Sequence, residues 1–298
     1  MENVRTLVDA LANWASRLVP DPDRARRLNR DLSELVDSQA LDPVSPLTPE
    51  VLSVVEASCH RTARHLTLQW HPEPAEPDTQ PPGWPAVSAA EVADRAGCLR
   101  SIERHERTGE LRLDGFDEVA AASPYLRAAF TLLRDCDALL LDLRFNGGGA
   151  LSSLAMVAEF VLGPTPTLLA TVHYRDRPAR QWWTTGGLGD LSLAAETRVA
   201  VLIGPGTYSS GEALAYHLRS RGRVRVFGHR TPGAADHVTP VRVTPSVTAL
   251  MPEATPADPV TDTNWEGVGV SPDTTCDPAD APSIARQWLA AARQSLRD

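Results

Sequence analysis

The chain has 298 residues, a formal net charge of −9 and 42% hydrophobic residues. This length is enough for one large α/β domain with a smaller helical piece and an ample core. All 29 basic residues are arginines, and they are scattered rather than gathered in a stripe. This distribution argues against nucleic-acid binding.

Residues 1–70 are predicted to form a helical subdomain. Its first helix is amphipathic, and a later helix opens with Thr48 as N-cap and Pro49 at the first helical position. The apolar positions of the first helix are Val4, Leu7, Val8, Leu11, Trp14 and Leu18. Charges lie between them and no basic leader precedes them, so we expect neither a signal peptide nor a membrane span.

Residues 71–86 are rich in proline and are predicted to be an extended, mobile linker. The four cysteines are widely spaced, without a C-x-x-C pair. This spacing predicts a reducing, cytoplasmic location and no zinc site. The cysteines are Cys59, Cys98, Cys136 and Cys276.

Residues 87–298 are predicted to be a layered α/β core, because strands and helices alternate along them after a short helix within 87–109. The predicted strands are 110–113, 138–143, 167–174, 198–203 and 223–227, with further strands in 238–250 that line a cleft. The predicted helices are 124–134, 151–162, 211–219 and 281–296.

The most informative segment is LLLDLRFNGGG, residues 139–149, in which an apolar strand runs into three glycines. A strand this apolar is buried on both faces, as in a parallel sheet, and such sheets bind ligands beyond the carboxyl ends of their strands. Gly147, Gly148 and Gly149 lack a Cβ, so their N–H groups can face a substrate, and a helix follows. An oxyanion hole and an ordinary strand–turn–helix corner both fit this segment.

A second corner favours the oxyanion hole. The apolar strand 198–203 leads through Gly-Pro-Gly into TYSSGE, which opens a helix. Ser209 and Ser210 therefore lie at a helix N-terminus, flanked by small residues that leave a hydroxyl open to substrate. The corner is similar to the turn that presents a hydrolase nucleophile, although a literal G-x-S-x-G is absent.

Four ordered motifs together resemble the tail-specific, or C-terminal-processing, serine protease family. They are DLRFNGGG, TYSSGE, RVRVFGHRTPGAADH and TDTNWEGVGVSPD. The branch they resemble most contains the tricorn core protease and the interphotoreceptor retinoid-binding protein modules. The resemblance implies a core of crotonase-like or ClpP-like βαβ units, a serine peptidase activity and no cofactor. No segment is left over for the PDZ domain of the processing proteases.

The resemblance places the nucleophile at Ser209, three residues before Glu212. The processing proteases use a lysine base in a G-K-G turn, but here that turn reads Gly233-Ala234-Ala235 and the chain contains no lysine. Arginine cannot replace it, because its guanidinium stays protonated. The tricorn-like branch uses histidine and glutamate instead, which correspond here to His65 and Glu266.

The resulting hypothesis is a Ser209, His65 and Glu266 triad, in which imidazole takes the serine proton and a carboxylate fixes its tautomer. Arg64 stands where the tricorn pattern has a serine, so one further catalytic group is replaced. His60 and His237 are competing candidates for the base.

The Ser210 and Gly148 N–H groups are the expected oxyanion donors, with Gly147 or Gly149 as alternatives to Gly148. Gly147, Gly149, Trp265 and His237 are expected to line the substrate site.

The expected substrate is a peptide or a peptide-like amide or ester, cleaved through an acyl-enzyme. A homo-oligomer of the chain is a further expectation. Two other classes of function remain open. One is a carrier of an apolar small molecule, and the other is a biosynthetic acyl-transfer or cyclisation enzyme. Fluorophosphonate labelling would separate the carrier from the hydrolase.

Overall fold

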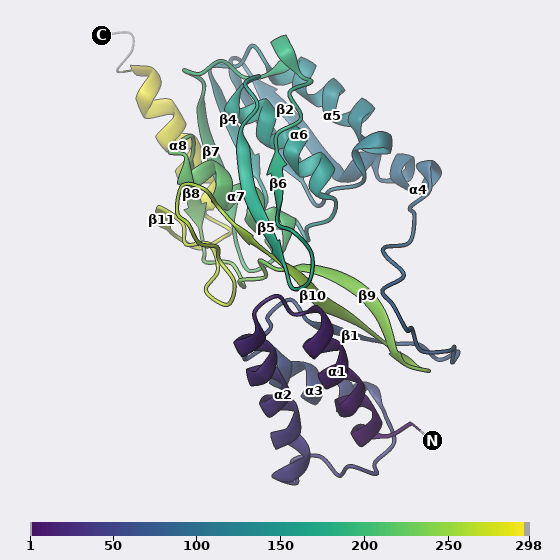
Figure 1. Cartoon of the computed structure of the whole chain (residues 1–298). Helices are drawn as coiled ribbons and strands as arrows, with labels where there is room; N and C mark the ends of the chain where they lie inside the picture. The colour runs from purple at the N-terminus through teal and green to yellow at the C-terminus, as the bar shows by residue number, and fades with distance from the viewer. Residues whose placement is uncertain (1, 295–298) are drawn as a thin grey trace. The chain divides into compact units, whose positions relative to one another are not determined.

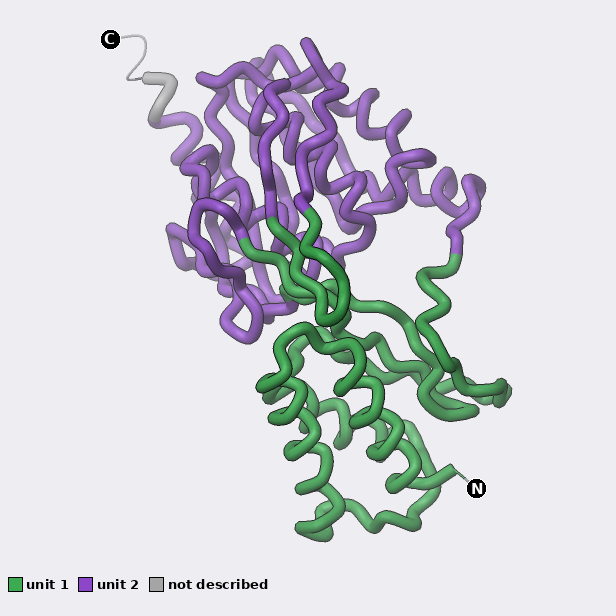
Figure 2. The backbone as a smooth tube through the Cα atoms, in the orientation of Figure 1, with its two compact units in different colours: residues 1–85, 171–180, 235–257 green, residues 86–170, 181–234, 258–298 purple. Residues whose placement is uncertain are grey.

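A computed structural model describes residues 2–294, and the chain divides into two compact units, shown in Figure 2. Unit 1 comprises residues 1–85, 171–180 and 235–257, and unit 2 comprises 86–170, 181–234 and 258–298. The N-terminal helices therefore share a unit with two later segments of the chain. Within the described residues, no helix has the length and apolar character needed to cross a membrane.

Unit 1 is built from three helices and an antiparallel sheet (Figure 1). The helices are α1 (Val4–Leu18), α2 (Pro22–Asp37) and α3 (Pro49–Cys59). The sheet has the order β1-β10-β5-β6, with β9 paired to β10. Its strands are β1 (Thr67–Trp70), β5 (Leu168–Tyr174), β6 (Arg180–Trp183), β9 (His237–Thr244) and β10 (Val247–Ala257), of which β5 and β6 continue into unit 2.

The helices of unit 1 form as their sequences predict. Asn3 and Thr48 accept backbone N–H bonds at the starts of α1 and α3. The apolar faces of the three helices bury leucines such as Leu11 and Leu32 against the sheet residues Val241 and Ala249. Burial of these faces provides the core of unit 1.

The proline-rich segment 71–86, which its composition predicts to be a linker, is hydrogen-bonded to strand β9. Three of its backbone N–H groups bond to β9 and the turn after it. Among them, Asp78 donates to the Arg242 carbonyl at 2.8 Å, and the Arg242 N–H donates back to Asp78 Oδ2 at 2.6 Å. The indole of Trp84 donates to the Val238 carbonyl at 3.0 Å. The segment is extended, as expected, and it is hydrogen-bonded along the edge of β9.

Unit 2 contains a six-stranded sheet of order β11-β8-β7-β4-β3-β2, parallel except for the β2–β3 pair. Its strands are β2 (Leu99–His105), β3 (Thr108–Leu113), β4 (Ala138–Asp142), β7 (Arg198–Ile203), β8 (Arg225–Gly228) and β11 (Thr274–Thr275). The central strands β4 and β7 are almost entirely buried, as a parallel sheet covered on both faces requires.

Helices cover both faces of this sheet (Figure 1). On one face Leu140, Leu202 and Phe227 pack against Leu289 of α8 (Ala281–Gln294). The alternate residues face α7 (Ser210–Ser220), which packs beside α6 (Leu151–Leu162), and α6 beside α5 (Val119–Leu133). The remaining short helices are α4 (Ala89–Asp94) and the 3-10 turns Ala96–Cys98 and Gly189–Leu191.

The layered α/β fold is confirmed, with two differences from the sequence analysis. The predicted strand at 167–174 forms as β5, but it joins the antiparallel sheet and not the parallel one. Strands β1, β2, β6 and β11 were not predicted. The last two residues of the predicted helix 281–296 lie outside the described residues.

Candidate active site

The turn between β7 and α7 gives Ser209 an unusual backbone. Its φ of 51° and ψ of −118° lie where L-residues are rarely found. The Gly211 N–H donates to the Tyr208 carbonyl at 2.9 Å, so Ser209 occupies the second position of a type II′ turn, which normally favours glycine. Such a conformation costs about 1–3 kcal/mol and persists only where the surroundings fix it.

The buried carboxylate of Glu212 fixes this turn. It accepts the Ser209 N–H at 3.0 Å, the Gly233 and Ala234 N–H groups at 2.7 and 2.8 Å, and the Thr231 hydroxyl at 2.5 Å. Burial raises the pKa of Glu212, and these four donors oppose that rise by favouring the charged form. The glutamate therefore ties the serine turn to the turn that stands in place of the lysine motif.

The triple-glycine turn lies directly against Ser209. A Cβ added to Gly148 would be 2.8 Å from the Ser209 Cβ and 3.1 Å from the Ser210 nitrogen. On its other side the turn is bonded to residues 114–116, because the Phe116 N–H donates to the Gly148 carbonyl at 2.8 Å. The two corners singled out in the sequence thus meet in unit 2.

Most backbone donors of the glycine turn are already used. The Gly147 N–H donates to the Asp114 carbonyl at 3.1 Å, and the Gly148 N–H to Asn146 Oδ1 at 2.9 Å. The Gly149 N–H has no acceptor among residues 2–294. The expected oxyanion donor Gly148 is therefore engaged elsewhere, and the alternative, Gly149, has the available N–H.

At the serine corner, one backbone N–H group is left without an acceptor in the described part of the chain. The Tyr208 and Ser209 N–H groups are bonded to the Asn146 carbonyl and to Glu212. The Ser210 N–H, the first of α7, has no acceptor in the described part of the chain, as expected for a helix N-terminus. The Ser210 hydroxyl instead donates to the Gly149 carbonyl at 2.7 Å, which directs it away from nucleophilic attack.

His65, in unit 1, is buried and has a defined tautomer. Its Nδ1 lies 2.5 Å from the Asp236 carbonyl. Because a carbonyl can only accept, Nδ1 carries the proton and Nε2 presents a lone pair. Burial lowers the pKa of His65 below its usual 6.5, so the ring stays neutral near pH 7. The tautomer role expected of Glu266 is thus taken by a backbone carbonyl.

The competing histidines lie in different settings. His60 Nε2 is 2.8 Å from the Leu66 carbonyl, so this ring supports the chain after α3. His237 is the first residue of β9, in register with Ala254, and not part of a loop.

Glu266 and Trp265 lie on the loop between β10 and β11, in unit 2. The loop packs on the lysine-replacing turn, because the Gly267 N–H donates to the Gly233 carbonyl at 2.8 Å. Glu266 is half-buried, and its N–H is capped by Asn264 Oδ1 at 2.8 Å. Trp265 is only 2% exposed and packs against Tyr216, so its ring belongs to the core and not, as expected, to a substrate surface.

The sequence analysis missed a buried cluster of hydrogen-bonded polar side chains at the far end of α7. His217 Nδ1 is 2.7 Å from Asp258 Oδ2, and Arg221 donates to the same oxygen at 2.8 Å. These bonds hold the pKa of Asp258 below its usual range despite burial, whereas burial lowers the pKa of His217. Forty-one residues separate the two partners, and no local motif marks the pair.

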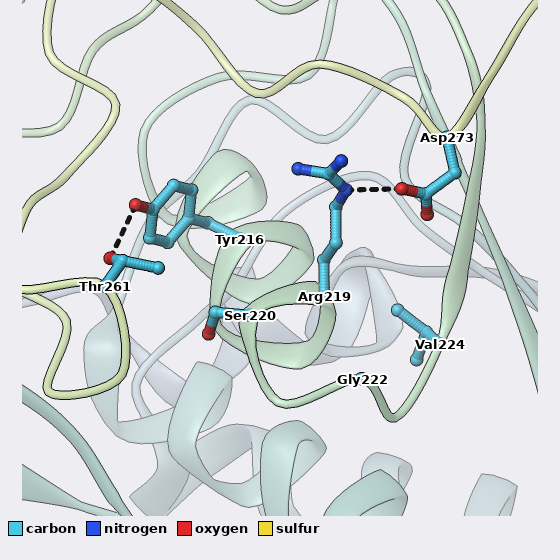
Figure 3. Close-up of a pocket in the computed structure, with 7 residues that line it drawn as sticks. All are labelled: Tyr216, Arg219, Ser220, Gly222, Val224, Thr261 and Asp273. Carbon is cyan, nitrogen blue, oxygen red and sulfur yellow. Dashed lines mark hydrogen bonds and ion pairs between the residues drawn. The ribbon is translucent and has the colours of Figure 1, made fainter.

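A cavity of about 300 Å³ lies at this same end of α7 (Figure 3). It is bounded by the Tyr216–Thr261 hydrogen bond at 2.8 Å and the Arg219–Asp273 ion pair at 2.7 Å. Its lining residues are Tyr216, Arg219, Ser220, Gly222, Val224, Thr261 and Asp273. None of them was expected in the active site.

The fold and the serine turn define an α/β protein that presents a serine beside a glycine-rich strand end. Residues 107–276 match the model of peptidase family S41, more than half of the chain, and the chain belongs to that family. The family predicted from the motifs is confirmed. The retinoid-binding relatives within the predicted branch stay a prediction.

Known proteins agree with this assignment. The chain is 32% identical over 130 residues to carboxyl-terminal-processing peptidase 2, chloroplastic, of Arabidopsis thaliana, which covers 43% of this chain and 24% of that protein. The chain thus spans about a quarter of that relative's length.

Two solved structures share the fold. A putative peptidase from Parabacteroides merdae matches with a TM-score of 0.65 and 16% identity over 97% of each chain. A putative S41 protease from Bacteroides fragilis matches with a TM-score of 0.54 and 18% identity, over 66% of this chain and 58% of that one.

Proposed function

We propose that this chain is a serine hydrolase that cleaves a peptide or a peptide-like amide or ester through an acyl-enzyme on Ser209. The observation that carries the proposal is the strained type II′ turn that presents Ser209 against the glycine turn. Backbone strain of this kind is typical of functional sites. Membership of a peptidase family supports the same chemistry.

In this proposal the tetrahedral oxyanion is stabilised by the Gly149 and Ser210 N–H groups. Both groups are without an acceptor in the described chain, whereas their neighbours are bonded. Donors that need no rearrangement stabilise the developing charge at low cost, and losing one lowers turnover about 100- to 1000-fold.

His65 is the proposed base. A neutral ring with Nδ1 protonated has the Nε2 lone pair needed to take the serine proton. Glu266 is proposed to act as the acid that stabilises the imidazolium, not as the group that fixes the tautomer.

Labelling with a fluorophosphonate tests the proposal. Ser209→Ala should abolish labelling and Ser210→Ala should retain it, because Ser210 contributes only its N–H. His65→Gln should slow labelling strongly, while the matched His60→Gln should not. If Ser209→Ala still labels, or if the wild-type chain does not label between about pH 6 and 9, the serine hydrolase assignment is wrong.

The Glu266→Gln variant measures how much Glu266 contributes to the rate of Ser209 labelling. In a triad whose carboxylate fixes the tautomer, the equivalent amide lowers turnover about 10,000-fold. Because the Asp236 carbonyl already fixes His65, we expect Glu266→Gln to slow labelling by much less than that. A loss of the full size would return the tautomer role to Glu266.

A further inference from the structure

Asn146, the residue before the glycine turn, is completely buried and bonds in three directions. Its Nδ2 donates to the Leu113 carbonyl at the end of β3 at 3.0 Å. Its Oδ1 accepts the Gly148 N–H at 2.9 Å, and its own carbonyl accepts the Tyr208 N–H at 2.8 Å. One side chain and its backbone thus join a strand end, the glycine turn and the serine corner.

The side chain of Asn146 is closely packed against the start of α7. A Cβ added to Gly211 would lie 2.7 Å from Asn146 Oδ1 and 2.8 Å from its carbonyl oxygen. The helix N-terminus that carries Ser209 therefore approaches this amide directly. Any rotation of the amide would break two buried hydrogen bonds at once.

The amide also decides which glycine can serve an oxyanion. Asn146 Oδ1 accepts the Gly148 N–H, so this donor is already occupied. The Phe116 and Ala150 bonds then fix the two peptides that flank Gly149. Within the described residues, the Gly149 N–H is the one donor of the turn that stays without an acceptor.

We propose that Asn146 is a positioning residue. By accepting the Gly148 N–H, its side chain fixes the glycine turn so that the Gly149 N–H, together with the Ser210 N–H, is the donor to the oxyanion. This inference rests on the proposed serine hydrolase function and deepens it. Asn146 touches no substrate, so its loss should change the chemical step and leave binding of the probe unchanged.

Saturation kinetics of fluorophosphonate labelling separate these two effects. For Asn146→Ala we expect the maximal labelling rate to fall about 100-fold, the size of one lost oxyanion donor, with the half-saturating probe concentration unchanged. Asn29→Ala is the matched control, because Asn29 makes a side-chain bond to Ser16 in unit 1 and should label as the wild type does. An unchanged maximal rate in folded Asn146→Ala would overturn the inference.

Asn146→Asp gives a signature that a merely structural role would not. A protonated aspartic acid reproduces the donor and acceptor of the amide, whereas the ionised form cannot donate to the Leu113 carbonyl. Because burial favours the neutral acid, its labelling rate relative to wild type should be highest at low pH and fall as the pH rises. A constant ratio across pH would contradict the proposal.

A measurement on the wild-type chain covers the case in which neither variant folds. Among the 19 glycines, labelled with nitrogen-15, the Gly149 N–H resonance should move when Ser209 is phosphonylated, and the Gly148 resonance should stay. Movement of Gly148 instead would overturn the role of Asn146 while leaving Ser209 as the labelled nucleophile. If Ser209→Ala still labels, the hydrolase proposal fails separately.

Discussion

Replacing single glycines of the turn 147–149 by alanine tests the geometry of the site most directly. Gly149 has a φ of +124°, and a Cβ there would lie 2.1 Å from the Phe116 carbonyl oxygen and 3.0 Å from its carbon. These are backbone atoms, so no rotamer can relieve the clash. Overpacking costs about 1–3 kcal/mol, and an L-residue at such a φ about 1–2 kcal/mol more. Gly149→Ala should therefore lower the free energy of unfolding by about 2–5 kcal/mol.

Gly147→Ala is the matched control two residues away. No atom lies within 4 Å of a Cβ at Gly147, and its φ is not positive. This variant should stay within about 0.5 kcal/mol of wild type. Urea unfolding followed by circular dichroism measures both, and labelling of Ser209 should be lost in Gly149→Ala alone. Equal stability of the two variants would refute the arrangement of the turn.

Three further outcomes follow from buried or bonded groups. Burial lowers the pKa of His65 in the folded protein, so the neutral ring stabilises the fold fully above pH 6.5 and this stabilisation is lost as the pH falls below 6.5. The urea midpoint of the wild type should fall over this pH range, and the fall should be smaller in His65→Gln. Asp258→Ala leaves His217 and Arg221 buried without their carboxylate and should cost about 3–5 kcal/mol in urea unfolding. Asp78→Ala removes the acceptor of the Arg242 N–H, so proteinase K should cut residues 71–86 faster than in wild type, and an unchanged digest would contradict the docking of this segment.

The central strands and helices could be predicted because each carries a local signal. β4 and β7 are continuous apolar runs, and α6 and α7 each follow a glycine turn. β2 was missed because five of its seven residues are exposed and polar, as suits the edge of a sheet. No local pattern distinguishes β5 from a parallel strand, since its place in the antiparallel sheet depends on pairing with β10, some eighty residues later.

The sequence indicated which residues belong to the candidate site, but it did not indicate which hydrogen bonds they make. Motif spacing identified Ser209, and the structure brings the glycine turn against it. The choice between Gly148 and Gly149 depends on where the Asn146 amide points, which sequence patterns do not encode. The carbonyl of Asp236 likewise has no sequence signature, because every residue carries the same group.

The turn at Gly233 and Ala234, which stands where the processing proteases carry their lysine, has a role without that lysine. Its two N–H groups hold Glu212, and through Glu212 the backbone of Ser209. Two residues further on, Asp236 is fixed by its ion pair with Arg24, and its carbonyl sets the His65 tautomer. In the proposed mechanism residues 233–236 therefore serve the nucleophile by holding Glu212, and serve the base by fixing the tautomer of His65.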